Sequence, residues 1–167
     1  EGLVASPEEI RGVEGVWGEG TAEVRISVAW ERFSALITRR RNLTGRTGCG
    51  LCGEETVENA VRELQPVGPG IRMSAADLHQ AITQLAQMQP INARTGSVHA
   101  AAWVLPGQGA GKGIQVVRED VGRHNALDKT IGALVRAGKD PAGGALLFTS
   151  RASFEMVQKS AVVGVTY

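Results

Sequence analysis

The sequence is poor in the features that mark several large protein classes. Its 167 residues include only two cysteines, and phenylalanine, tryptophan and tyrosine together make up 4%. Two cysteines cannot cross-link a fold of this size, which excludes a disulfide-stapled scaffold. No apolar run approaches the roughly 18 residues that a transmembrane helix needs. The 18 basic and 17 acidic residues leave a net charge of +1, which argues against a dedicated nucleic-acid-binding or membrane-surface protein.

What is present is the composition of a globular protein. Hydrophobic residues account for 43% and charged residues for 21%, and 22 glycines predict many tight turns over an aliphatic core. The length predicts a single domain, residues 1–167. Residues 1–9 hold neither the basic nor the apolar region of a secretory signal, so we expect a cytoplasmic protein whose thiols stay reduced.

Strand-like and helix-like segments alternate along the chain, which predicts an α/β protein with a layered mixed sheet and flanking helices. The expected strands are residues 21–29, 32–38, 98–105, 114–118 and 145–149, the last covered on both faces. One expected helix follows a capping box at Ser74, and two more cover 122–137, closed by Gly138, and 150–163. The expected core-facing stripes are Leu78, Ile82, Leu85 and Ala86; Leu127, Ile131, Leu134 and Val135; and Phe154, Val157 and Ala161.

The first cluster with chemical potential is a CxxC motif. Cys49 and Cys52 follow a run of arginines, residues 39–46, in a glycine-rich segment that predicts a loop. Nearby positive charge lowers a cysteine pKa and populates the thiolate, which is the nucleophile. The pattern therefore favours reactive cysteines. The alternatives are a solvated basic loop beside two inert cysteines, and a zinc site completed by two of His79, His99 and His124.

Two strand-to-helix junctions carry the remaining polar candidates. Arg123 and His124 follow the strand 114–118, and Ser150 and Arg151 follow the strand 145–149. Ligands of open α/β sheets bind beyond the carboxyl ends of the strands, and helix N-termini favour anions. The sequence thus predicts a phosphate-binding edge. The alternatives are a buried histidine held by Asp120 and simple N-capping by one of the serines.

Two familiar motifs are not matched. The segment 109–113 is not a phosphate-binding P-loop, because the first glycine of that motif would fall at Pro106 and no serine or threonine follows Lys112. The chain also lacks the H-x-E and P-C-x-x-C pair of zinc deaminases, since Gly48 precedes Cys49.

Three segments together resemble the formate dehydrogenase accessory sulfurtransferases (FdhD). They are RTGCGLCG at 46–53, REDVGRHNALDK at 118–129 and SRASFEMVQK at 150–159. The resemblance implies a cytidine-deaminase-like fold without the zinc site. It also implies a cytoplasmic sulfurtransferase that takes sulfur as a persulfide from a cysteine desulfurase. The sulfur passes to the molybdenum bis(molybdopterin guanine dinucleotide) cofactor of formate dehydrogenase, with Cys49 as the persulfide-bearing cysteine and Cys52 as its partner.

On this resemblance the chain is a fragment lacking N-terminal strands and a C-terminal cofactor-binding segment. Its expected cofactor-binding residues are Arg123, His124, Ser150 and Arg151, with no bound metal of its own. The expected partners are the desulfurase, formate dehydrogenase and the molybdenum cofactor, without nucleic acid or membrane, and a homodimer is a further candidate assembly. Two other functions stay open: a dithiol redox or metal-binding module, and a non-catalytic molybdenum-cofactor chaperone.

Overall fold

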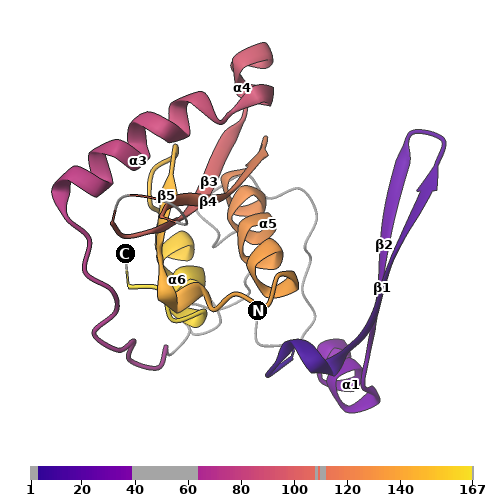
Figure 1. Cartoon of the computed structure of the whole chain (residues 1–167). Helices are drawn as coiled ribbons and strands as arrows, with labels where there is room; N and C mark the ends of the chain where they lie inside the picture. The colour runs from indigo at the N-terminus through magenta and orange to yellow at the C-terminus, as the bar shows by residue number, and fades with distance from the viewer. Residues whose placement is uncertain (1–3, 39–63, 108, 110–111, 167) are drawn as a thin grey trace. The chain divides into compact units, whose positions relative to one another are not determined.

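The computed structural model describes residues 4–38, 64–107, 109 and 112–166 (Figure 1). The chain divides into two compact units, Glu1–Thr44 and Gly45–Tyr167. We call them the hairpin unit and the sheet unit. None of the helices in the described ranges is long and apolar enough to cross a membrane.

The described residues of the hairpin unit form a short 3-10 helix, two antiparallel strands and one α-helix. A short 3-10 helix η1 (Pro7–Glu9) leads into β1 (Ile10–Gly18), which pairs with β2 (Thr21–Val28). Gly20 takes the positive φ of 72° that the tight turn between them requires. The expected strand 21–29 is thereby confirmed as β2. Its partner β1 was not expected, because glycines at 12, 15 and 18 interrupt the strand pattern.

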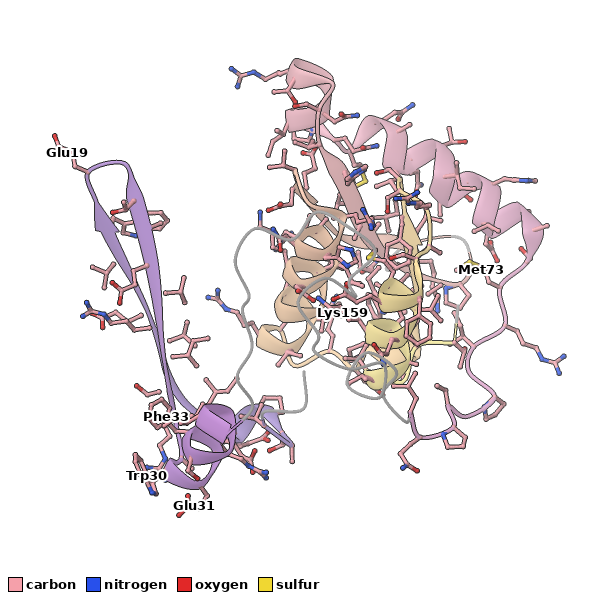
Figure 2. All side chains as sticks on the ribbon, turned by 180° about the vertical axis from the view of Figure 1, so that it is seen from behind. Glu19, Trp30, Glu31, Phe33, Met73 and Lys159 are labelled. Carbon is pink, nitrogen blue, oxygen red and sulfur yellow. The ribbon has the colours of Figure 1, made fainter. Side chains whose placement is uncertain are left out.

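The expected strand 32–38 is wrong, because these residues belong to helix α1 (Trp30–Thr38). Trp30, Phe33 and Ile37 recur at the spacing of a helix face rather than at strand alternation. The rings of Trp30 and Phe33 lie 5.7 Å apart between centroids, and Figure 2 labels both on the helix. The guanidinium of Arg32 donates to Glu9 Oε1 at 2.7 and 3.1 Å, which ties the helix to the start of the hairpin.

In the described part of the sheet unit, three strands lie in the order β4-β3-β5. The central strand β3 (His99–Leu105) pairs antiparallel with β4 (Gly113–Asp120) and with β5 (Ala145–Phe148). The expected strands 98–105, 114–118 and 145–149 are confirmed. The expected mixed sheet is wrong for the described residues, where β3 pairs antiparallel with both of its neighbours and no parallel pair is present.

Helices cover both faces of this sheet (Figure 1). On one face, α5 (Arg123–Arg136) and α6 (Phe154–Val162) pack Leu127, Leu134 and Met156 against alternate residues of β3 and β5. On the other face, α3 (Ala75–Gln87) packs Ala81 and Leu85 against the remaining ones. The short α4 (Pro90–Thr95) and the 3-10 helix η2 (Pro141–Gly143) also belong to this unit. β5 is covered on both faces, as expected.

The helix termini follow the sequence signals closely. Ser74 and Asp77 form the expected capping box, in which Asp77 N–H donates to Ser74 Oγ at 3.1 Å. Gly138, with a φ of 63°, closes α5 by donating to the carbonyl of Val135. The expected helix 150–163 begins later than its pattern indicated, at Phe154, and Ser153 is its N-cap residue.

The expected apolar stripes are only partly correct. Leu127 and Leu134 of α5 are fully buried, whereas Val135 is 39% exposed. On α3, Leu78 and Ile82 are exposed, because the small Ala81 faces the alanines at 100 and 102 of β3 and brings the helix close to the sheet.

On α6 the expected stripe is wrong. Phe154 and Val157 are 51% and 56% exposed, and Met156 and Ser160 are buried instead. The Ser160 hydroxyl donates to the carbonyl of Met156 at 2.9 Å, so this polar group can face the core without losing a hydrogen bond.

Candidate functional site

The strand order brings the two expected junctions to one edge of the sheet. β4 and β5 both run antiparallel to β3, so their carboxyl ends lie on either side of the first residue of β3, His99. His99 pairs with Asp120 at the end of β4. Thr149, just after β5, receives a hydrogen bond on its hydroxyl from Ala100 N–H at 2.8 Å. The segments that carry Arg123, His124, Ser150 and Arg151 therefore start at the same edge.

Of these four residues, His124 has a largely enclosed side chain. Its side chain is 13% exposed, and Nδ1 lies 3.1 Å from Oε2 of Glu155 in the first turn of α6. This is ion-pair distance when the ring is protonated. Both ring nitrogens are buried, and neither makes an aligned hydrogen bond within the described ranges. The contact between His124 and Glu155 joins the beginnings of α5 and α6.

Asp120 does not hold His124, contrary to one of the expected alternatives. Its Oδ1 accepts hydrogen bonds from Gly122 N–H at 2.8 Å and from Asn125 Nδ2 at 3.2 Å, and Oδ2 lies 2.5 Å from Lys129 Nζ. Burial raises the pKa of Asp120, but the hydrogen bonds from Lys129, Gly122 and Asn125 outweigh it and leave the pKa lowered. Asp120 therefore shapes the turn into α5.

Neither helix at this edge begins with a side-chain cap. Gly122 is the N-cap residue of α5, and Ser153 of α6 makes no capping hydrogen bond. The Ser153 hydroxyl is buried and has no hydrogen-bond partner within the described ranges, while the Ser150 hydroxyl donates to the carbonyl of Arg151 at 3.3 Å. Simple N-capping by these serines is thus not what the structure contains. First-turn amides without a side-chain cap suit an anionic ligand.

The two arginines differ in their surroundings. Arg123, the first residue of α5, is partly buried, whereas Arg151 is exposed between β5 and α6. Lys159 of α6 (labelled in Figure 2) contacts both carboxylate oxygens of Asp128 on α5 at 2.7 and 3.0 Å. That ion pair fastens α6 to α5 and fixes the spacing of the two helix beginnings.

The cysteine cluster cannot be added to this geometry. Cys49 and Cys52, the arginines at 39–46 and the loop expected at 45–53 all lie outside the described residues. Within the described part of the chain, no three histidine, cysteine, aspartate or glutamate side chains come together as metal ligands. His79 belongs to α3 and His124 to α5, which pack on opposite faces of the sheet, so these two histidines do not share a zinc site.

Sequence reasoning missed Glu155 as a member of the site. It follows His124 by 31 positions and sits on a different helix, so no local spacing links them. The available signal was indirect: Glu155 lies inside the segment 150–159, at a junction already expected to meet that of His124.

Comparisons with known proteins agree with this architecture. The FdhD/NarQ family model matches residues 1–167. The sulfur carrier protein FdhD of Variovorax paradoxus (strain S110) is 43% identical over 165 residues, which are 99% of this chain and 58% of that protein. The protein of the same name from Xanthomonas campestris pv. campestris (strain B100) is 48% identical over 162 residues, 96% of this chain and 56% of the relative.

A solved structure shows the same fold. The crystal structure of a formate dehydrogenase accessory protein from Desulfotalea psychrophila superposes with a TM-score of 0.65 at 21% sequence identity. The match covers 99% of this chain and 56% of that one. The chain thus spans somewhat more than half the length of the relatives it matches. A family model that matches every residue, together with relatives above 40% identity, shows that the chain belongs to the FdhD/NarQ family.

Proposed function

We propose that this chain carries sulfur for the maturation of formate dehydrogenase. The observation that carries the proposal is the 48% identity, over 96% of the chain, to a protein named sulfur carrier protein FdhD. A CxxC motif next to a run of arginines supplies the chemistry that such a carrier needs. The proposed donor is the persulfide of a cysteine desulfurase. The proposed acceptor is the molybdenum bis(molybdopterin guanine dinucleotide) cofactor, which is the substrate here.

Loading is a thiol–disulfide type exchange at Cys49. The Cys49 thiolate attacks the outer sulfur of the donor persulfide, the donor's S–S bond breaks, and the donor cysteine leaves as a thiolate. Cys49 then carries a persulfide, and no net oxidation has taken place. The adjacent arginines would favour the thiolate that begins this step.

In the proposed release of sulfur from Cys49, Cys52 has a separate role. Its thiolate attacks the inner sulfur of the Cys49 persulfide, a disulfide forms between the two cysteines, and the outer sulfur leaves as hydrosulfide. Hydrosulfide has the oxidation level of a sulfur ligand on a metal. A cellular thiol reductant must then reopen the disulfide before the next cycle.

The edge formed by the two junctions is the proposed site for the anionic, nucleotide end of the cofactor. Uncapped first-turn amides of α5 and α6 would donate to phosphate oxygens, and Arg123 and Arg151 would add charge. His124 and Ser150 would contribute the remaining polar contacts. His124 is suited to this role because its buried nitrogens lack aligned hydrogen bonds within the described ranges.

Three further expectations are part of the same proposal. The fold is cytidine-deaminase-like without a zinc site, since the deaminase ligand motifs are missing from the sequence. The protein works in the cytoplasm, where its thiols stay reduced. Its protein partners are the desulfurase and formate dehydrogenase.

Intact-mass spectrometry tests the loading step directly. After incubation with a cysteine desulfurase and cysteine, the chain should gain about 32 Da, one sulfur atom, in a form that a thiol reductant removes. Cys49→Ala should not load. Cys52→Ala should load and then fail to release hydrosulfide, which separates the two roles. Equal loading of the Cys49→Ala variant would show that the assignment is wrong.

A further inference from the structure

Two side-chain contacts join α5 to α6, one helical turn apart. His124 Nδ1 lies 3.1 Å from Glu155 Oε2 at the candidate edge. Four positions further along each helix, Lys159 Nζ lies 2.7 and 3.0 Å from the two carboxylate oxygens of Asp128. Residues four apart share one face of a helix, so both contacts lie along the same α5–α6 interface. The ion pair of Lys159 and Asp128 thereby helps to hold Glu155 beside His124.

The Glu155 carboxylate decides which nitrogen of a neutral His124 carries the proton. A neutral imidazole holds one proton, on Nδ1 or on Nε2, and the other nitrogen is then an acceptor. An ionised carboxylate only accepts hydrogen bonds, so the proton is favoured on Nδ1, the nitrogen nearest to it. Nε2 of the neutral ring then presents a lone pair, which cannot donate a hydrogen bond to an anion.

Protonation of the ring changes what Nε2 offers to a ligand. Both nitrogens of an imidazolium donate, so Nδ1 keeps its contact with Glu155 while Nε2 gains a proton to donate. Nε2 is buried, and nothing in the part of the chain that the structure describes accepts from it. A phosphate oxygen would satisfy this donor. The positive ring would also compensate Glu155, whose negative charge in the first turn of α6 repels an incoming anion.

The other charged groups near His124 have partners or keep a fixed charge near neutral pH. On β4, the Asp120 carboxylate contacts Lys129. On α5 itself, Asp128 contacts Lys159 of α6, and the Arg123 guanidinium stays protonated. None of these groups changes its charge where histidine titrates, between about pH 5 and 8.

His99 is a second histidine on the same side of the sheet. Alternate residues of a strand share a face, and Ala101 and Trp103 of β3 pack in the cluster formed with α5 and α6. His99 therefore lies on that face, opposite Asp120 of β4 in the strand register. A pH dependence measured at this edge must accordingly be assigned to His99 or to His124 by experiment.

We propose that Glu155 is a positioning residue that makes anion binding at this edge depend on a proton. It fixes Nδ1 of His124 as the protonated nitrogen, so Nε2 donates to a phosphate oxygen only when the ring is charged. Anion binding then takes up a proton at His124, and the affinity falls as the pH rises through the titration of the ring. The inference rests on the anion site of the proposed function and adds its dependence on pH.

A purely structural role for the contact predicts a different result. A side-chain pair that only fastened α6 to α5 would affect stability when broken. It would not alter how the affinity for a ligand changes with pH. The pH profile of binding therefore separates a positioning role from a structural one.

The probe is GDP-mannose, a nucleoside diphosphate in which both phosphates are esterified. The terminal phosphate of GDP titrates near about pH 6 and would obscure the proton taken up by the protein. Isothermal titration calorimetry measures binding to the full chain between about pH 5.5 and 8.5. We expect the affinity of the wild type to fall by about tenfold or more over this range, the worth of one charge-assisted hydrogen bond.

Glu155→Gln keeps the size of the side chain and removes its charge. The amide of glutamine can donate to Nδ1, which allows the neutral ring to carry its proton on Nε2. We expect this variant to bind like the wild type at about pH 5.5 and about tenfold more tightly than the wild type at about pH 8.5. Identical pH profiles of the variant and the wild type would overturn the proposal.

The chain has three histidines, which supply the controls. His124→Gln should abolish the pH dependence, and His99→Gln should retain it. His79→Gln is the matched control, because His79 is exposed on α3, which packs on the opposite face of the sheet. It should leave both the affinity and the pH profile unchanged. Loss of the pH dependence in His99→Gln but not in His124→Gln would assign the proton to His99 and overturn the proposal.

A second measurement does not require the ligand. Long-range 1H–15N correlations in NMR spectra show which ring nitrogen of a neutral histidine is protonated. At about pH 8.5, His124 should carry its proton on Nδ1 in the wild type and shift toward Nε2 in Glu155→Gln. A proton on Nε2 in the wild type would overturn the proposal.

The same titrations distinguish this inference from the anion site on which it rests. Failure of the wild type to bind GDP-mannose at any pH would reject the anion site, and the proton requirement with it. Binding by the wild type that does not change with pH would reject the proton requirement alone.

Discussion

The two units use their apolar residues in opposite ways. In the sheet unit, Leu127, Leu134 and Met156 are fully buried between helix and sheet. In the hairpin unit, Val13, Trp17, Val24 and Ile26 share one face of the two-stranded sheet, and they are 65%, 82%, 64% and 58% exposed. A two-stranded hairpin alone is marginally stable in water. The comparison teaches that the sheet unit supplies most of the buried apolar packing and also holds the candidate anion-binding edge.

The largest difference between the units is expected when one apolar side chain in each is shortened to alanine and the free energy of unfolding is measured. Leu127→Ala should lower the free energy of unfolding by about 2–5 kcal/mol, because it leaves a cavity in the sheet unit. Val13→Ala removes an exposed side chain and should change it by about 0.5 kcal/mol or less. Urea denaturation followed by circular dichroism measures both values. Similar losses for the two variants would contradict the division of stability between the units.

A smaller effect is expected at the candidate anion site, which lies wholly within the sheet unit. GDP, a mimic of half of the proposed cofactor, should bind, and Arg123→Ala or Arg151→Ala should weaken it by about tenfold, or about 1.4 kcal/mol. Lys112→Ala is the control, since the glycine loop lacks P-loop spacing. Isothermal titration calorimetry provides the affinities. Loss of affinity in Lys112→Ala alone would move the phosphate site to that loop.

The smallest expected effect is a loss of folding stability at acid pH. One carboxylate in each unit contributes to this loss. In the hairpin unit the Arg32 hydrogen bond lowers the pKa of Glu9; in the sheet unit hydrogen bonds led by Lys129 outweigh burial and lower that of Asp120. A lowered folded-state pKa gives stability that is present above the unfolded value of about 4 and is lost as the pH falls through the folded value.

Salt should separate these two contributions. The Glu9 side chain is 28% exposed and that of Asp120 is 14% exposed, so salt should screen the Glu9 ion pair more strongly, whereas the contribution of Asp120 should persist. Stability measured between about pH 2 and 6, at low and at about 1 M salt, checks this in Asp120→Asn and Glu9→Gln. If Asp120→Asn keeps the full acid dependence at high salt, Asp120 is not its source.

Much of the sheet unit could be predicted from the sequence, because its signals are local and agree with one another. The apolar run 98–105, the capping box at Ser74 and the glycine at 138 each specify their element without help from distant residues. The hairpin unit was predicted less well. Glycines hid β1, and a short apolar run was taken for a strand where its spacing in fact suits helix α1.

Two features depended on tertiary structure: which face of each helix is buried, and which residues meet at the candidate site. Whether Leu78 or Ala81 of α3 faces inward is decided by the alanine surface of β3, which no helical periodicity contains. The contact between His124 and Glu155 likewise requires α5 and α6 to pack side by side. The positions of the junctions could be predicted, but the residues that meet there could not.

The order of strands β4-β3-β5 also has a consequence for how the protein folds. β3 and β4 are joined by a short loop and can pair early, whereas β5 reaches β3 only after the chain has closed a loop that contains α5. The hydrogen bond between Ala100 and Thr149 spans 49 positions in the sequence. Contacts of such long range form slowly, since the entropy of loop closure must be overcome first. The edge that gathers His99, His124 and Ser150 is therefore completed late, and a partly folded chain still on the ribosome would present β3 and β4 without the candidate site.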